Sequence, residues 1–493
     1  MNPNIAANQQ RLFLAFLAEL RPHVRRDSSL PRRIRDIFAR NRSIGSRDRK
    51  LYRELIYTYL RFLPWIDPLL DGARQRGDGQ TTGLAPTAGS EAGGARSAGA
   101  LRARAEHTDV ATAAKITAWL APDLKPTSAY RAAHCGDWPP VPAPLAEKAA
   151  VLTQLLPSSD IKQHTPPVGH PSQEGIQSDL GPLYQEGCHE VTGCVGSSAP
   201  RSPLPASRFL PDALLPAWFR SHCPAAFEPP HLDALNSRAN IWVRIQAADR
   251  NLVLDEFRAQ GWTLEQPADY PDALCLPPNA EVATSDAYRR GFVEIQDLGS
   301  QLVLAHAPQL TGRWLDACAG AGGKTLQLAR MLGAAGHVDA TDIRPDILDE
   351  LDDRAKRARL DNITIVQKPA NEYDGVLVDA PCSGSGTWRR QPHLKWHVKP
   401  ETIAAFSKTQ LEILATNAPR VKPGGLLIYA TCSLSHCENQ DTVATFLKAH
   451  PDFTAEKPAQ NHGGIFDGLG TTLLPGTRNT DGFYVALLRR CWT

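Results

Sequence analysis

Hydrophobic positions near the start of the chain recur at the spacing of amphipathic helices. The apolar positions are Leu12, Phe13, Phe16 and Leu17, then Ile34, Ile37 and Phe38, then Leu51, Leu55, Ile56 and Tyr59. Spacings of three and four residues place such side chains on one face of a helix. The same pattern returns at residues 110–120 and 145–156, so we predict a helical domain over residues 1–156.

Two stretches interrupt this pattern. Residues 72–108 are rich in Gly, Ala, Ser and Thr, and residues 157–207 are rich in Pro, Gly, Ser and Gln. Such segments bury too little apolar surface to offset the entropy of ordering them. We therefore predict a flexible insertion and a low-complexity linker, respectively. The linker contains Cys188, His189 and Cys194, whose spacing fits none of the usual zinc pairs, so we expect no metal site.

The pattern changes after the linker. Within residues 208–291, NIWVRIQ and DALCLPP predict strands, and LVLDEFRAQGW predicts a helix that ends at Gly261. We expect a small α+β module there.

Strand and helix patterns alternate over residues 292–493, which favours a doubly wound α/β domain with a largely parallel sheet. The expected strands are RWLDA, HVDATD, ITIVQ, YDGVLVDA, GGLLIYATCS and FYVALLRR, and the expected helices cover residues 324–332, 346–358, 400–418 and 438–449. Ligands of such sheets bind beyond the carboxyl ends of the strands. Candidate chemistry is therefore sought in the loops that follow the strands.

Composition narrows the class of protein only slightly. The 493-residue chain has a formal net charge of +2, so any nucleic-acid site must come from local clustering. The N-terminal helices carry such a cluster, which would attract phosphates or else form a solvated basic surface: Arg25, Arg26, Arg32, Arg33, Arg35, Arg40, Arg42, Arg47, Arg49, Lys50 and Arg53. Ten scattered cysteines indicate reduced thiols, and neither a signal peptide nor a membrane span is recognisable, so we expect a cytoplasmic protein.

The first candidate loop is DACAGAGGKT, which follows a predicted strand and opens a helix. Glycines at a strand-to-helix turn let the backbone approach a nucleotide-like cofactor. A phosphate-binding P-loop is disfavoured, because Cys318 stands where that motif needs glycine. Asp342 ends the next strand about 20 residues later, where an acid accepts ribose hydroxyls in dinucleotide-type folds. Its alternative role is to cap the following helix.

Two cysteines end neighbouring predicted strands. Cys382 lies in DAPCSGSGTWRRQPHLKW, and Cys432 lies in YATCSLSHCENQ. A lone buried cysteine is more often inert packing, but two in adjacent loops favour a chemical role. The first loop also interleaves basic and aromatic side chains in a way that suits a nucleic-acid strand: Trp388, Arg389, Arg390, His393, Lys395 and Trp396.

Taken together, these three motifs resemble those of the Sun/RsmB-type RNA cytosine-5 methyltransferases. FVEIQDLGSQLV and DGFYVALLRR also resemble that family, and the N-terminal helices resemble the NusB-like RNA-binding domain of its bacterial ribosomal members. The resemblance implies a Rossmann-like domain that uses S-adenosyl-L-methionine. The cofactor-binding residues that it implies are Cys318, Ala319, Gly320, Ala321, Gly322, Gly323, Lys324, Asp342 and Asp379.

The resemblance also assigns catalytic roles. Carbon 5 of cytosine is a poor nucleophile until a thiolate adds to carbon 6. The family's attacking cysteine matches Cys432, and the cysteine that assists release of the product matches Cys382. Asp379 matches the acid that hydrogen-bonds the cytosine edge, and Lys324 is expected to help supply thiolate.

The chain departs from the family pattern after its third predicted strand. An acid that contacts the adenine is expected there, but the chain has Lys368, Pro369 and Asn371. Asn371 and Glu372 are the candidates to replace it. The resemblance implies that the small module over residues 208–291 binds RNA. In that module Gln246 stands where the family has asparagine, two residues after the matching Arg244.

We expect a monomer that methylates RNA, with small-subunit ribosomal RNA as the preferred substrate and transfer RNA as the closest alternative. A non-catalytic RNA-binding ribosome-assembly factor is a second hypothesis, motivated by the missing acid. A DNA cytosine methyltransferase is the third, and the TCS cysteine argues against it because DNA enzymes take their nucleophile from a proline-cysteine motif. The target nucleotide cannot be read from the sequence.

Overall fold

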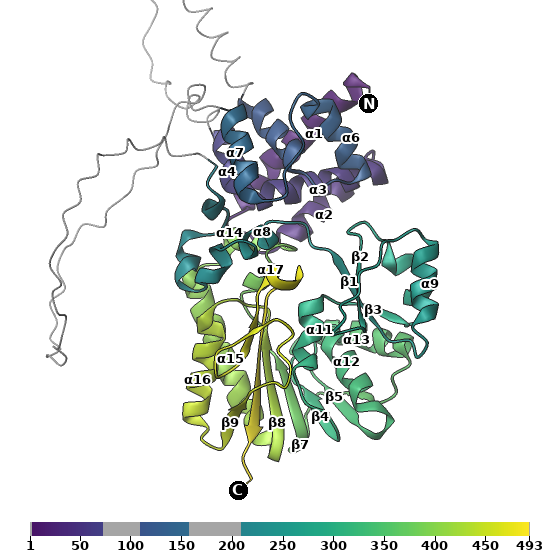
Figure 1. Ribbon diagram of the computed structural model, residues 1–493, viewed down its shortest axis with the longest axis vertical. Coiled ribbons are helices and arrows are strands. Elements are labelled where there is room, and N and C mark those ends of the chain that lie inside the picture. Colours follow the sequence, from purple (N-terminus) through teal and green to yellow (C-terminus); the bar gives the residue numbers. More distant parts are fainter. Residues whose placement is uncertain (1, 72–108, 157–208, 493) are drawn as a thin grey trace, which may run out of the picture.

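The computed structural model describes residues 2–71, 109–156 and 209–492. The predicted insertion and linker, with Cys188, His189 and Cys194, lie outside the described residues. Figure 1 shows the N-terminal helices stacked on the end of a large sheet at which α14 and α17 lie, with a smaller sheet beside it. No helix in the described part of the chain is long and apolar enough to cross a membrane.

The N-terminal layer is helical, as the spacing of apolar residues predicted. Its elements are α1 (Pro3–Leu20), η1 (Arg21–His23), α2 (Leu30–Arg40), α3 (Ser46–Arg61), α4 (Leu63–Asp71), a helix over residues 109–120, α6 (Lys125–Cys135) and α7 (Leu145–Leu155). Pro3 opens α1, and the Asn2 side chain caps it by accepting from the backbone N–H of Asn4. The core of this layer includes Phe13, Leu55 and Trp65, all fully buried.

A short connecting region joins this layer to the rest of the molecule. Its elements are η3 (Pro211–Leu214), η4 (Ala217–Ser221), η5 (Pro224–Phe227) and α8 (His231–Leu235). One continuous apolar cluster runs from the N-terminal helices through Phe219 of η4 to Trp388 and Leu434 of the large domain. The N-terminal layer is therefore packed firmly against the large domain, because the two share one core.

The smaller sheet is antiparallel, in the order β2-β1-β3. Its elements are β1 (Ile241–Ile245), α9 (Asn251–Ala259), β2 (Ala273–Leu276), η6 (Val282–Thr284), α10 (Asp286–Arg289) and β3 (Val293–Ile295). Arg244 on β1 is almost fully buried, and its guanidinium donates to the Gln246 and Gln296 side chains and to the Gly323 carbonyl. The arginine that matches the family pattern thus ties this module to the loop after β4.

The large sheet has nine strands in the order β10-β11-β12-β8-β7-β4-β5-β6, with β9 paired to β12. The strands from β8 to β6 are parallel, and β12 is antiparallel to β8. The elements of this domain are α11 (Leu298–Ala305), β4 (Arg313–Asp316), α12 (Gly323–Leu332), η7 (Gly333–Ala335), β5 (His337–Ala340), α13 (Pro345–Ala358), β6 (Ile363–Ile365), β7 (Tyr373–Asp379), η8 (Ser385–Thr387), α14 (Leu394–His397), α15 (Pro400–Asn417), η9 (Ala418–Arg420), β8 (Val421–Thr431), η10 (His436–Glu438), α16 (Gln440–Ala449), β9 (Phe453–Glu456), β10 (Ile465–Phe466), β11 (Thr471–Leu473), α17 (Pro475–Arg478) and β12 (Phe483–Arg490).

Helices cover both faces of this sheet. Alternate residues of one strand enter different cores: Val376 packs with α15 and α16, and Leu377 packs with α11 and α12. The chain builds β4, β5 and β6 in one direction and then crosses to β7 on the other side of β4. The strand order therefore reverses between β4 and β7, which is where open α/β sheets bind ligands. The predicted doubly wound, Rossmann-like fold is confirmed.

Candidate active site

The loop after β4 is shaped by its glycines. Gly320 and Gly322 have positive φ values of 51° and 87°. A Cβ atom at Gly322 would lie 2.8 Å from side-chain atoms of both Leu326 and Leu351, so this position also needs glycine for packing. A Cβ at Gly323 would meet no atom within 4 Å. The turn therefore leaves open space at the start of α12.

Asp342 contacts this loop directly. Its carboxylate accepts the backbone N–H of Gly320 at 2.9 Å, the backbone N–H of Arg344 at 2.9 Å, and the Arg344 guanidinium. Burial opposes ionisation of Asp342, but these hydrogen bonds hold the pKa of its carboxyl below the ordinary value. The carboxylate does not cap α13, whose N-cap is Arg344. The next residue, Ile343, is 96% exposed and offers an apolar surface beside the loop.

Lys324 and Asp379 form an ion pair across the strand-order reversal. Lys324 Nζ donates to Asp379 Oδ2 at 2.7 Å, and it lies 5.1 Å from the centroid of the Phe483 ring. The Lys324 side chain is 8% exposed and that of Asp379 is 31% exposed. Lys324 thus pairs with the carboxylate that ends β7, and neither thiol is among its described partners. The pair fixes the direction of the more accessible Asp379.

The two predicted cysteines meet at the carboxyl ends of β7 and β8. Their Sγ atoms lie 3.3 Å apart, which is a thiol hydrogen bond between two free cysteines. Both side chains are half-buried. The hydrogen bond with Cys432 and burial raise the pKa of the Cys382 thiol well above its ordinary value. Cys382 is therefore held as a neutral thiol in contact with Cys432.

A buried carboxylate, which the sequence analysis did not single out, holds both thiol loops. Glu438 is fully buried and accepts the Ser383 backbone N–H at 2.8 Å, the Ser383 hydroxyl at 2.5 Å and the Ser433 hydroxyl at 2.5 Å. Ser383 and Ser433 each directly follow one of the two cysteines. Gln410 of α15 also donates to this carboxylate. The only hint in the sequence is an acid six residues after Cys432, which is too general to interpret.

The close approach of the loops also depends on a glycine. Gly386 donates its backbone N–H to the Cys432 carbonyl and accepts from the Gly482 backbone N–H. A Cβ atom at Gly386 would lie 2.1 Å from the Gly482 carbonyl oxygen, so no larger residue fits there. The cysteine loops and the start of β12 are therefore held together by direct backbone hydrogen bonds.

Three carboxylates lie close to the loop after β4. Asp316, Asp342 and Asp379 surround the loop, and burial together with these three carboxylates raises the pKa of the Cys318 thiol. Burial also raises the pKa of Asp316 to about 7, with the charge of Asp379 adding to the rise. Carboxylates beside a loop can face a cationic ligand, and here Asp342 and Asp379 are also paired with Arg344 and Lys324. The positively charged sulfonium of S-adenosyl-L-methionine is such a group, and the residues present fit this cofactor.

One prediction about the RNA site is wrong. The basic and aromatic side chains after Cys382 were expected to face a nucleic-acid strand, but Arg389 is 1% exposed and Lys395 and Trp388 are fully buried. Lys395 Nζ donates to the carbonyls of Arg61 and Leu214 and to the Asn236 side chain. Arg389 donates to the Thr480 carbonyl and to the Asn479 side chain. Arg390 forms ion pairs with Asp297 and Asp481. His393 is 2% exposed. The Trp396 indole N–H donates to the Leu60 carbonyl. The segment joins layers of the molecule, because these groups satisfy carbonyls where the layers meet.

The prediction that Glu372 replaces the adenine-contacting acid is also wrong. That residue directly precedes β7, so it lies at the amino end of a strand whose carboxyl end carries Asp379, roughly 20 Å away at 3.3 Å per residue. There it lines a cavity of about 670 Å³ with Trp314 and Lys422. Asn371 comes one residue earlier and is exposed. Lys368, which is exposed, follows β6 more closely than either.

The large domain is therefore a Rossmann-like α/β domain with a glycine loop after β4 and paired thiols beyond β7 and β8. Residues 303–489 match the family described as 16S rRNA methyltransferase RsmB/F. That similarity covers most of the large α/β domain.

Individual proteins are also similar to the chain. The chain is 35% identical over 272 residues to the ribosomal RNA small subunit methyltransferase B of Salmonella paratyphi A, covering 52% of this chain and 61% of that protein. It is 33% identical over 297 residues to the probable ribosomal RNA small subunit methyltransferase B of Bacillus subtilis, covering 57% and 66%. The match thus spans less than two thirds of these relatives. The crystal structure of PH0851 has the same fold, with a TM-score of 0.59 at 20% identity over 92% of this chain and 93% of that one.

Proposed function

We propose that this protein transfers a methyl group from S-adenosyl-L-methionine to carbon 5 of a cytosine in small-subunit ribosomal RNA, through a covalent adduct with Cys432. The observation that carries the proposal is the pair of thiols 3.3 Å apart beside Asp379. A single structural cysteine would need no such partner. The protein is expected to act in the cytoplasm and as a monomer.

Cys432 is assigned as the nucleophile of the pair. The raised pKa of Cys382 disfavours its thiolate, and a neutral thiol at 3.3 Å can donate a hydrogen bond to a thiolate on Cys432. Addition of Cys432 Sγ to carbon 6 forms the S–C bond and places electron density on carbon 5. After methylation the proton on carbon 5 must leave, and the S–C bond breaks with return of Cys432 as thiolate. Cys382 is in place to assist this elimination.

Asp379 is assigned to the cytosine edge. Its carboxylate ends β7 next to the thiols, is 31% exposed, and is held by Lys324. It can bind a protonated nitrogen 3 of the base, which offsets the negative charge that develops when the thiolate adds. Lys324 acts as a positioning residue in this proposal, because its ammonium contacts the carboxylate and not the thiols.

S-adenosyl-L-methionine supplies an electrophilic methyl group when it is bound. The backbone from Cys318 to Lys324 would lie against it, with the acids of the loop facing its sulfonium and amino groups. Asp342 is assigned to the ribose hydroxyls, which would share the carboxylate with Arg344. Ile343 would cover the adenine, so binding of this ring would depend on apolar contact more than on an acid.

The proposal is tested with radiolabelled S-adenosyl-L-methionine and small-subunit ribosomal RNA transcribed without modifications. We expect label in RNA, recovered as 5-methylcytidine after nuclease digestion, and no label with Cys432→Ala. Transfer RNA and DNA oligonucleotides are compared in parallel. Label in transfer RNA alone would mean that transfer RNA, and not ribosomal RNA, is the substrate. Label at a position other than carbon 5 would overturn the proposed chemistry.

The alternative of a non-catalytic ribosome-assembly factor makes a different prediction. Such a factor would bind ribosomal RNA without transferring label to it. The retention of Cys382, Cys432 and Asp379 in contact with their partners favours the enzyme, since RNA binding alone requires none of these groups.

A further inference from the structure

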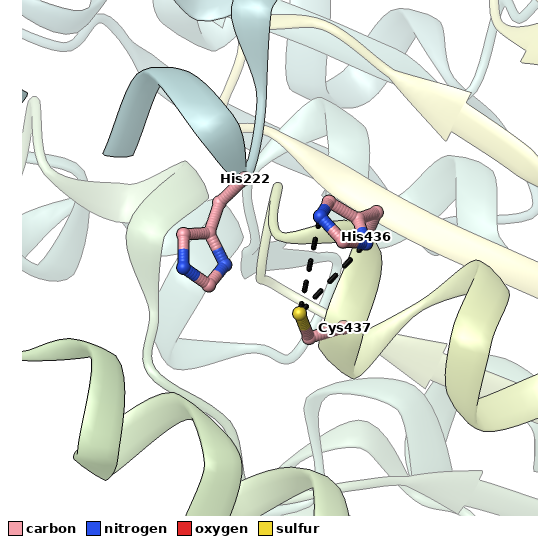
Figure 2. Close-up of side chains that lie close together, drawn as sticks. All are labelled: His222, His436 and Cys437. Atoms are coloured by element: carbon pink, nitrogen blue, oxygen red, sulfur yellow. Dashed lines mark hydrogen bonds between the residues drawn. The ribbon is translucent and has the colours of Figure 1, made fainter. Parts of the chain in front are cut away.

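Three metal-ligating side chains cluster outside the candidate active site. His222 follows η4 in the connecting region, whereas His436 and Cys437 lie in η10. One ligand atom of each lies within 4.8 Å of the other two, and this is the one such cluster found among the described residues. Figure 2 shows the two imidazoles and the thiol gathered around one space.

The distances suit a single ion. Cys437 Sγ lies 3.7 Å from His436 Nδ1 and 3.9 Å from Nε2. A tetrahedral zinc ion bound at its usual bond lengths holds sulfur and nitrogen ligands about 3.5 Å apart. Cys437 Sγ and a ring nitrogen of His436 therefore need to approach each other by only a few tenths of an ångström. All three side chains are half-buried, so an ion can reach them from solvent.

Neighbouring groups orient both imidazoles. Asp441 Oδ2 lies 2.7 Å from His436 Nδ1, and the Ser435 hydroxyl lies 2.9 Å from His222 Nδ1. A metal-bound histidine normally donates its second ring N–H to a carboxylate or another acceptor, which fixes the tautomer. With Nδ1 engaged in each ring, the Nε2 atoms are left as ligands.

The two segments are also held together by the backbone. The His436 N–H donates to the His222 carbonyl at 3.1 Å, and the two rings stack with centroids 5.6 Å apart. Trp218 also packs edge-on against the His222 ring, with a centroid distance of 5.3 Å. These contacts preorganise the cluster, since no large rearrangement is needed to bring the three ligands together.

We propose that His222, His436 and Cys437 form a binding site for a zinc-like transition-metal ion. Two nitrogens and one thiolate are a ligand set for zinc and similar borderline ions, with a fourth position open to water. Binding releases the Cys437 proton to solvent. The bound ion cross-links the connecting region to η10, which also carries Glu438 and leads into α16. The site thus fastens the N-terminal half of the molecule next to the thiol loops.

The test is titration of the full-length, chelator-treated protein with Co²⁺, which reports thiolate ligation by a charge-transfer band and tetrahedral geometry by intense visible absorption. We expect saturation at one equivalent, displacement by Zn²⁺, and loss of the charge-transfer band in Cys437→Ser. His222→Gln should weaken binding, and Asp441→Asn should weaken it by about 10–100-fold, the usual cost of removing a group that orients a ligand.

Three matched variants identify other sources of the signal. Cys491→Ser, at another half-buried thiol, should leave the titration unchanged. A band that persists in Cys437→Ser but disappears in Cys432→Ser would assign the ion to the candidate active site and overturn the proposal. Loss of the charge-transfer band in Cys188→Ser would overturn the proposal as well. The same holds if the wild type binds no Co²⁺ saturably. Circular dichroism of each variant establishes that the fold is retained.

Discussion

At the scale of single residues, Glu438 explains how two thiols on different strands come to lie in contact. Its carboxylate accepts from the residues that follow both cysteines. A fully buried carboxylate without such donors would be costly, so the network stabilises the acid and the acid in turn fixes both loops.

Glu438→Ala should therefore lower kcat by about 100-fold with a smaller effect on KM, since a misplacement of the order of 1 Å at reacting groups has this cost. Stability should fall by about 1–3 kcal/mol, because the Ser383 and Ser433 hydroxyls lose their acceptor. Glu438→Gln keeps one acceptor oxygen and should be intermediate. Steady-state kinetics and thermal unfolding test this, with exposed Glu412→Ala as the control. A loss of kcat/KM of the same size that comes from a higher KM alone, with kcat unchanged, would contradict a positioning role.

Asp316 predicts a pH dependence of stability. It is 1% exposed, and burial raises the pKa of its carboxyl from 3.8 to about 7. Between these values the folded protein holds a proton that the unfolded chain has released, so stability falls as pH rises, by up to about 1.4 kcal/mol per pH unit. Thermal unfolding between about pH 4 and about pH 8 should show a smaller loss for Asp316→Asn than for the wild type. Parallel curves for the two proteins would contradict this assignment.

At the scale of elements, the segment between β7 and α15 connects the layers of the molecule. Trp388 is fully buried in the cluster that joins the N-terminal helices to the large domain, and Lys395 reaches three acceptors from different elements. Because such a segment contributes to several packing contacts at once, its substitutions should affect the whole fold.

Trp388→Ala should lower the free energy of unfolding by about 3–5 kcal/mol, the usual cost of truncating a large buried aromatic side chain. Leu252→Ala on α9 is the control, because Leu252 is 52% exposed and its truncation should change stability by no more than about 0.5 kcal/mol. Urea unfolding of both variants decides the matter. A small effect of Trp388→Ala would mean that the layers are held together by other contacts.

The periodic elements and the loops at the strand ends could be predicted from the sequence. The strands from β4 to β8 and β12 lie where the hydrophobic pattern put them, and the meeting of Cys382 and Cys432 follows from two parallel neighbours ending at the same edge. Burial of the basic segment after Cys382 could not be predicted, because it depends on carbonyls more than 150 residues away, such as that of Leu214. The approach of His222 to His436 could not be predicted either, because these residues are also far apart in the sequence.

At the scale of the whole molecule, the basic N-terminal helices give the chain a candidate surface for RNA. The exposed arginines of α2 and α3 for which no described partner is found include Arg32, Arg35, Arg47 and Arg53. Burial raises the pKa of Tyr57, and the charges of Arg53 and Arg35 oppose that rise, which indicates that these two arginines lie near the same side chain. Basic side chains of α2 and α3 therefore lie near each other at this position.

The double variant Arg35→Ala/Arg53→Ala should weaken binding to unmodified ribosomal RNA and make it less dependent on salt. Each lost phosphate contact reduces the slope of log K against log salt by about 0.7 for a single strand. The matched control is Arg258→Ala/Arg289→Ala, which removes two exposed, ion-paired arginines from the small module. Filter binding over a salt series measures both. An unchanged slope in the first variant would exclude this surface from the RNA site.

The most direct test of the central claim is a denaturing gel of protein incubated with S-adenosyl-L-methionine and end-labelled ribosomal RNA. We expect a covalent protein–RNA band that accumulates in Cys382→Ala, because elimination is slowed, and that is absent when Cys432→Ala is added to the same chain. A band that survives the removal of Cys432, or no band in Cys382→Ala under conditions where the wild type transfers methyl groups, would contradict the proposed two-thiol mechanism.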